Sequence, residues 1–167
     1  MAHPLHLAVG NILRILETPE ILVLLDEACG GNRRTEVYGA EKVCLAYVDA
    51  AIAVDGEIKV VLEIEESNDR PVALCGKVTA VAMSKWCIHG GIKYSLSQSL
   101  FFVQMFLEKP GKERSKHAQC LYLEAEIPKA IRQIAKYSYH HGTVDEFLNA
   151  PEHGEALLKE IRNFLEI

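Results

Sequence analysis

The most chemically informative stretch of the sequence runs from Val43 to Lys77 and carries several carboxylates on two apolar segments. Asp49 lies inside the first segment, and the letters EIEE at residues 63–66 end the second. Carboxylates in β-branched, apolar segments are costly to bury unless they face water or a positive group. Acidic side chains close to one another repel, and a divalent cation relieves that repulsion. These residue types therefore predict a metal site.

The dipeptide DG at residues 55–56 separates the two segments and is a strong signal for a tight hairpin turn. We expect two antiparallel strands, the first continuous or bent, over residues 43–54 and 58–65. Side chains alternate along a strand, so Glu63 and Glu65 share one face. Counting back from the turn places Asp49 opposite residue 62 or 63. We therefore expect Asp49 and Glu63 to come within the span of one metal ion.

An exposed strand end with solvated acids is the plain structural alternative to a metal site. Two observations favour the site. Asp49 has the apolar letters AYV before it and AAI after it, so its surroundings are those of a core strand. The acids of the second segment come directly after the most apolar part of that strand, where solvated charge is least expected.

The remaining elements are predicted from apolar residues at helical spacing and from Pro and Gly at their ends. Thr18 is expected to cap a second helix with Pro19 at its first position, ended by the glycines at 30–31. The glycines at 90–91 are expected to end a helix that Pro71 opens. We expect helices over residues 5–27 (interrupted at Thr18-Pro19), 71–88, 115–135 and 155–165. We expect a buried strand over residues 95–107 and a loop or a short helical turn over residues 32–40.

The bulk properties indicate one folded domain spanning residues 1–167. Hydrophobic residues make up 49% of the chain, and no apolar run is long enough to cross a bilayer, so we expect no membrane contact. The five cysteines are scattered and odd in number, which favours reduced thiols in a cytoplasmic protein. A net charge of −5 argues against a protein that coats nucleic acid, but an enzyme with an acidic metal site remains compatible with it.

The order of expected elements predicts an α/β fold, with a central mixed β-sheet, an N-terminal hairpin of strands and flanking helices. This order and the acids on it resemble the PD-(D/E)XK nuclease superfamily, over about residues 5–135. Asp49 matches the Asp of the motif, Glu63 its first acid, and Glu65 the position usually held by Lys. Lys77, in the helix that follows, is the candidate for a displaced lysine. The resemblance implies the restriction-endonuclease-like αβββαβα order and hydrolysis of phosphodiesters that depends on Mg²⁺ or Mn²⁺.

The resemblance also implies a role for each matched residue. Asp49 and Glu63 would ligate one or two metal ions, and the backbone carbonyl of Ile64 would complete the site. Glu65 would orient or deprotonate the attacking water. Lys77 would stabilise the negative charge that develops on the phosphate. The sequence departs from the motif in two ways, because no proline precedes Asp49 and a glutamate replaces the usual lysine.

Several other residues are candidates for contact with nucleic acid or for the site. The basic segment KPGKERSK is the best local candidate for a phosphate backbone, with a solvated turn as its alternative. Its cations are Lys109, Lys112, Arg114 and Lys116. Gln104, in the expected strand, would either extend towards the site or hydrogen-bond within the sheet. The histidines at 140–141 are expected in a surface loop.

Three functions fit these residues. The first is a nuclease acting on nucleic acid, with DNA as the first expectation. The second is a catalytically inactive protein of the same fold that acts as a scaffold or protein-interaction module. The third is a small α/β domain that binds a cationic molecule through its acids. The apolar face of the last helix would support a homodimer or pack on its own core. Its apolar residues are Leu157, Leu158, Ile161, Phe164 and Leu165.

Overall fold

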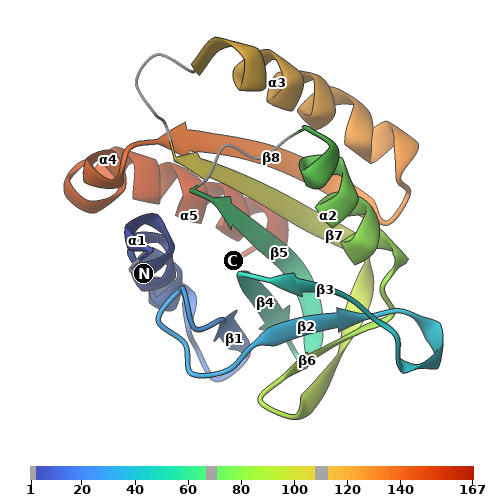
Figure 1. The fold of residues 1–167 in the computed structure, drawn as a ribbon. Helices are drawn as coiled ribbons and strands as arrows, with labels where there is room; N and C mark the ends of the chain where they lie inside the picture. The colour runs from blue at the N-terminus through green and yellow to red at the C-terminus, as the bar shows by residue number, and fades with distance from the viewer. Residues whose placement is uncertain (1–2, 67–70, 108–112) are drawn as a thin grey trace.

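The computed structural model describes residues 3–66, 71–107 and 113–167, and within them it has an α/β fold with a mixed eight-stranded sheet flanked by helices (Figure 1). The α-helices are α1 (Pro4–Leu13), α2 (Pro71–Met83), α3 (Glu113–Ala130), α4 (Val144–Asn149) and α5 (Pro151–Leu165), with short 3₁₀ turns η1 (Arg14–Leu16) and η2 (Ala40–Lys42). The strands are β1 (Ile21–Leu25), β2 (Thr35–Tyr38), β3 (Cys44–Val48), β4 (Ala50–Val54), β5 (Glu57–Glu65), β6 (Trp86–His89), β7 (Ile92–Leu107) and β8 (Ile134–Gly142).

The long strand β7 organises the sheet. β5 lies parallel to β7 on one side, and β8 lies parallel to its second half on the other. On the far side of β5 the order continues through β4 to β1, both pairings being antiparallel. The first half of β7 pairs with β6, and β2 and β3 follow, which gives the β6–β2–β3 extension. Because β5, β7 and β8 are parallel, their carboxyl ends meet at one edge.

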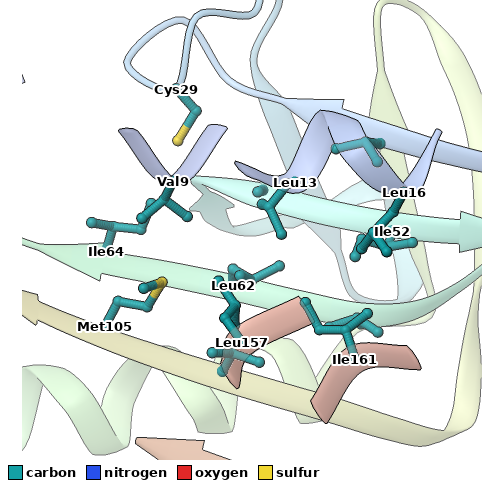
Figure 2. Packing of buried hydrophobic residues seen from close by; sticks show 14 of the residues in the cluster. Val9, Leu13, Leu16, Cys29, Ile52, Leu62, Ile64, Met105, Leu157 and Ile161 are labelled. Carbon is teal, nitrogen blue, oxygen red and sulfur yellow. The ribbon is translucent and has the colours of Figure 1, made fainter. Parts of the chain in front are cut away.

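Helices cover both faces of the sheet, and each face has its own apolar core. On one face α1, α4 and α5 pack against β1, β4, β5 and β7, and Leu13, Leu62 and Leu157 lie fully buried there (Figure 2). On the other face Val78 and Val81 of α2 and Ile127 of α3 pack on the sheet. The apolar face of α5 therefore packs on the protein's own core, which leaves the homodimer reading of that face without support.

The predicted hairpin is confirmed. Asp55 and Gly56 both have positive φ, 50° and 80°, as a type I′ turn requires, and they join β4 to β5. The register pairs Ala50 with Leu62, so Asp49 lies beside the acidic end of β5, as expected. The first strand is bent rather than continuous, and the bend that separates β3 from β4 is at Asp49 itself.

The prediction of a second helix after Thr18 was wrong, because residues 21–25 form β1. Thr18 closes a tight turn instead: its backbone exchanges hydrogen bonds with Ile21, and its hydroxyl accepts the Ile21 N–H at 3.1 Å. A short apolar run fits a buried strand as well as a helix, and pairing with β4 decides between them. The expected loop over residues 32–40 was also wrong in part, since it contains β2.

The helix opened by Pro71 is real but ends at Met83, short of the predicted residue 88. Trp86 begins β6, and the glycines at 90–91 form the turn of the β6–β7 hairpin, with φ of 57° and 82°. They therefore do not end a helix. The histidines at 140–141 lie in β8, paired with β7, and not in the surface loop that we expected.

Other predictions are confirmed. β7 includes the expected strand over residues 95–107, and α5 includes the expected helix over residues 155–165. α3 covers most of the expected helix and contains Pro128. None of the helices in the described residues has the length and apolar content needed to span a bilayer.

Candidate functional site

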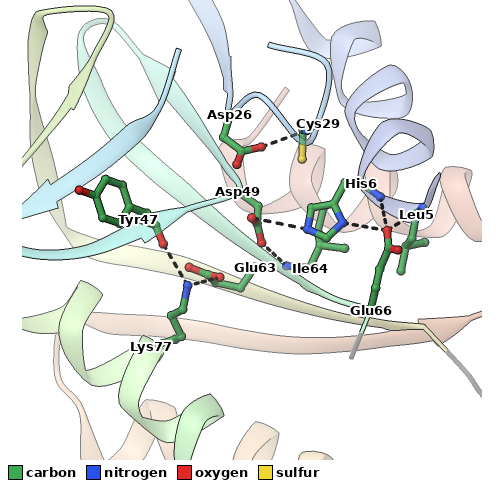
Figure 3. Close-up of polar contacts among 10 residues, drawn as sticks. All are labelled: Leu5, His6, Asp26, Cys29, Tyr47, Asp49, Glu63, Ile64, Glu66 and Lys77. Atoms are coloured by element: carbon green, nitrogen blue, oxygen red, sulfur yellow. Dashed lines mark hydrogen bonds and ion pairs between the residues drawn. The ribbon is translucent and has the colours of Figure 1, made fainter. Parts of the chain in front are cut away.

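The predicted acids and the predicted lysine line one pocket at the carboxyl end of β5. The bend between β3 and β4 contributes Asp49, β5 contributes its last acidic residues, and α2 contributes Lys77 (Figure 3). The pocket is lined by Asp49, Glu63, Ile64, Glu65, Ala73, Lys77 and Gln104. The sequence prediction that Asp49 and Glu63 lie near each other is therefore confirmed, and Lys77 joins them.

Asp49 is held in place by groups from three parts of the chain. Its Oδ2 accepts the backbone N–H of Ile64 at 2.7 Å, which ties the bend to the end of β5. Its Oδ1 lies 3.6 Å from Nε2 of His6 on α1. Its backbone carbonyl accepts the N–H of Asp26 at 3.0 Å. The carboxylate is thus fixed in orientation before any ligand arrives.

Glu63 is the most constrained acid of the pocket, with 4% of its surface exposed. Its Oε2 accepts a charge-assisted hydrogen bond from Lys77 Nζ at 2.9 Å, while its buried Oε1 has no hydrogen-bond partner among the described residues. Burial, the neighbouring charge of Asp49 and a hydrogen bond to Asp49 that needs the protonated acid raise the pKa of Glu63 to about 8, against the opposing effect of Lys77. In its charged form the carboxyl group therefore has one oxygen that a bound cation would satisfy.

Lys77 connects the pocket to β3. Its Nζ donates to the backbone carbonyl of Tyr47 at 3.0 Å in addition to Glu63. Burial alone would lower the pKa of this ammonium, but the carboxylates of Glu63, Asp49 and Glu65 outweigh burial and raise it. Lys77 therefore stays charged at neutral pH, and its side chain is 43% exposed, so a ligand can reach it.

Gln104 lies directly across from Glu63 in the register of β5 and β7. Its side chain lines the pocket, and no described residue forms a hydrogen bond with its buried Oε1. Of the two alternatives for this residue, the extension towards the site is therefore the one observed. Glu65 also lines the pocket and is half-buried.

His6 is a neighbour of the site that the sequence did not reveal. Its Nδ1 lies 2.8 Å from Oε1 of Glu66, which also accepts the N–H groups of Leu5 and His6 and so caps α1. Burial would lower the pKa of His6, yet the carboxylates of Asp49 and Glu66 raise it to about 9. Only the packing of α1 against the end of β5 brings these residues together, so no local pattern signals it.

Asp26 is a second neighbour of the site that the sequence did not reveal. It follows β1, and its Oδ1 accepts the N–H of Cys29 at 2.9 Å. Burial, chiefly, and the charge of Asp49 raise its pKa. The region was predicted as a helix, so its approach to the bend at Asp49 could not be anticipated.

The residues predicted to contact nucleic acid lie between β7 and the first turn of α3. Lys109 and Lys112 lie outside the described residues. Arg114 and Lys116 belong to the first turn of α3, where the structure describes the helix but not these side chains. The carboxyl end of β7, at Leu107, lies at the same edge of the sheet as the pocket.

Two places could hold a cation. His3, His6 and Glu66 offer ligand atoms within 4.8 Å of one another, two of them imidazole nitrogens, which suit Zn²⁺ better than Mg²⁺. A metal at either place must first displace a proton, because the pKa values of His6 and Glu63 are both raised. The pocket offers the carboxylates of Asp49 and Glu63, which are the hard oxygen ligands that suit Mg²⁺. The unpartnered Oε1 of Glu63 fits such an ion.

Comparisons of the chain with known protein families, with curated proteins and with solved structures found no match.

Proposed function

We propose that the protein hydrolyses phosphodiesters of nucleic acid with the help of Mg²⁺ or Mn²⁺ held at the pocket. The observation that carries the proposal is the set of contacts around the Glu63 carboxyl group. One of its oxygens pairs with Lys77, the other is buried without a partner among the residues that the structure describes, and Asp49 lies beside it. A buried acid with a raised pKa beside a second carboxylate in a pocket is typical of a functional site, and a divalent cation would relieve the repulsion.

The order of elements supports a PD-(D/E)XK type of fold. α1 precedes the hairpin that carries Asp49, β5 carries the E-x-E acids, and α2, β7 and α3 follow in that order. The strands β1, β4, β5 and β7 are neighbours in the sheet, with β5 and β7 parallel. On this reading β2, β3, β6, β8, α4 and α5 are additions to the αβββαβα order that the resemblance implies.

The residues present fit the metal. Asp49 and Glu63 would hold it through oxygen, with the backbone carbonyl of Ile64 as a third ligand. A bound ion supplies a water of lowered pKa and offsets charge on the phosphate. Glu63 must lose its proton to bind the ion, and the protein holds Lys77 close enough to favour the charged carboxylate.

The other residues of the pocket take the roles that their chemistry allows. The ammonium of Lys77 lies where it would contact a phosphate oxygen and stabilise its growing negative charge. Glu65 would orient or deprotonate the attacking water. The amide of Gln104 has an unpartnered oxygen that would accept a hydrogen bond from a metal-bound water.

A catalytically inactive protein of the same fold, serving as a scaffold or interaction module, is the second candidate. One observation favours it: the acids already have internal partners, since His6 lies between Asp49 and Glu66, and Lys77 pairs with Glu63. In that case the pocket would be a set of ion pairs that stabilises the edge of the sheet, and it would bind no metal.

A nuclease assay separates the two candidates. Labelled single-stranded DNA, duplex DNA and RNA are incubated with the protein in Mg²⁺, in Mn²⁺ and in EDTA. We expect cleavage with either metal and none in EDTA, with DNA cut in preference to RNA. Asp49→Asn and Lys77→Met should each lower the rate by at least about 100-fold.

Lys129→Met is the matched control, because Lys129 also pairs with a glutamate but on the exposed surface of α3. Its rate should equal that of the unmodified protein. Cleavage that survives in Asp49→Asn at full rate would mean that the pocket is not the active site, and no cleavage of any substrate by the folded protein would favour the inactive candidate.

A further inference from the structure

The outer face of the β6–β2–β3 extension is a second surface with a distinctive composition. Alternation along β2 buries Thr35 and Val37 against the core and turns Glu36 and Tyr38 to the other side. The register continues this outer face across the neighbouring strands and into the start of β7. It comprises Glu36, Tyr38, Tyr47, Trp86, Ile88 and Lys93.

Two of the three aromatic residues on this face are directly opposite each other on neighbouring strands. Tyr38 lies directly opposite Trp86, and Tyr47 lies directly opposite Glu36. Directly opposite residues on one face have side chains in contact range. Tyr47 is 51% exposed, and Tyr38 and Trp86 are half-buried, so ring surface is available to a ligand. In Figure 1 these strands lie at the bottom of the view, below β5 and α2.

Cations sit over two of these rings. The guanidinium carbon of Arg34 lies 5.6 Å from the centre of the Tyr47 ring, and Nζ of Lys93 lies 4.1 Å from the centre of a Trp86 ring. The register places two acids on this face: Glu36 accepts a hydrogen bond from the Tyr38 hydroxyl, and Glu57, opposite Ser95, pairs with Lys59. The surface therefore joins stacking rings with a local excess of positive charge, in a protein whose net charge is −5.

The outer face lies on the opposite side of the sheet from the pocket. Ala46 and Val48, the neighbours of Tyr47 in β3, pack on the α2 side, where the pocket lies, so the Tyr47 side chain points the other way. Only the backbone carbonyl of Tyr47 reaches the pocket, where it accepts a hydrogen bond from Lys77 (Figure 3). The cations at Arg34 and Lys93 would meet the phosphates of a strand bound to the outer face.

We propose that the outer face of the β6–β2–β3 extension binds single-stranded nucleic acid. Only unpaired bases offer their faces to aromatic rings, whereas a duplex offers its backbone to basic stripes. The rings and the two cations match a single strand in both respects. The inference goes beyond the proposed function, because binding to this face does not require cleavage at the pocket.

The test uses the single tryptophan of the chain, Trp86, as its probe. The full-length protein is titrated in EDTA with an oligothymidylate and, separately, with a duplex of the same length, while tryptophan fluorescence is followed. We expect saturable quenching by the single strand and at least about tenfold weaker binding of the duplex. No quenching by the single strand, or equal affinity for the duplex, would overturn the inference.

Variants are compared by the anisotropy of a labelled oligothymidylate. Tyr47→Ala should raise the Kd about tenfold, since stacking of one base is worth that much or more. Tyr122→Ala is the matched control, because Tyr122 is 67% exposed on α3 and lies away from this face in the fold. An unchanged Kd in Tyr47→Ala would contradict the inference. If that variant fails to fold, Arg34→Ala and Lys93→Ala replace it, each with a Kd raised several-fold.

The failures of the two proposals are distinguishable. Glu63→Gln should abolish cleavage and leave the binding of the oligothymidylate in EDTA unchanged. Binding without any cleavage by the unmodified protein would count against the nuclease alone. Cleavage with no binding of single strands would count against the outer face alone. Light scattering tests a further outcome. If the unmodified protein is a dimer and Tyr47→Ala is a monomer, this face binds a second copy of the chain, and the inference is overturned.

Discussion

At the scale of single residues, Glu63 is the acid of the pocket whose ionised form the fold disfavours. It is buried, it has one like-charged neighbour in Asp49 and one opposite charge in Lys77, and the balance raises its pKa to about 8. Folding therefore favours the protonated form of this acid more than the unfolded chain does. Such a group is a poor choice for stability alone, which supports our proposal that Glu63 serves to bind a metal ion.

The pH dependence of stability follows from the sign of that shift. The protonated Glu63 contributes stability that is fully present below its ordinary pKa of 4.5 and is lost as the pH rises through about 8. Glu63→Gln should remove this loss, so the variant should be the more stable protein at pH 8.5, by an amount on the order of a few kcal/mol. Urea unfolding in EDTA at pH 5, 7 and 8.5 measures it.

Glu57→Gln is the control for that series, since Glu57 begins the same strand and is half-exposed beside Lys59. It should keep the pH profile of the unmodified protein. Added Mg²⁺ should stabilise the unmodified protein more at pH 8.5 than at pH 6, because the ion competes with the proton on Glu63. A Glu63→Gln profile that parallels the unmodified one would contradict the raised pKa.

At the scale of elements, close approach between segments positions the site. Gly10, inside α1, has no room for a side chain, because an added Cβ would lie 2.1 Å from the carbonyl oxygen of Cys29. This contact lets α1 sit against the loop after β1 and so brings His6 to Asp49. In α2, by contrast, an added Cβ on Gly76 meets nothing within 4 Å.

Two glycine-to-alanine substitutions in helices should therefore change the stability of the protein in opposite directions. Gly10→Ala should destabilise the protein by about 1–3 kcal/mol, because backbone must move to admit the methyl group. Gly76→Ala should stabilise it by about 0.5–1 kcal/mol, because alanine restricts the unfolded chain and favours the helix. Urea denaturation at neutral pH compares them. A neutral Gly10→Ala would show that α1 does not approach Cys29 as described.

The elements that could be predicted from the sequence are those whose signals are local. The Asp55-Gly56 turn fixed the register, and alternation then placed Asp49 and Glu63 together. β1 could not be predicted, because five apolar residues fit a helix or a strand until β4 pairs with them. β8 was missed because its partner, β7, is distant in sequence and its polar histidines lack the pattern of a buried strand.

At the scale of the whole molecule, the pocket exists because five separate segments meet at one edge of the sheet. The sequence predicted the contributions of the β4–β5 hairpin and of α2, since both follow from turn chemistry and helical spacing. It did not predict the arrival of His6 on α1 or of Asp26 after β1, because only tertiary packing brings these side chains to Asp49. Parallel pairing of β5 with β7 adds Gln104.

The most direct test of the central claim is the location of Mn²⁺ by anomalous diffraction from crystals soaked in the ion at pH 8.5. We expect an ion bound by the carboxylates of Asp49 and Glu63, absent from Glu63→Gln crystals and retained in Asp55→Asn, whose acid lies in the exposed hairpin turn. An ion found only at His3, His6 and Glu66, or no ordered ion near Glu63, would contradict the account.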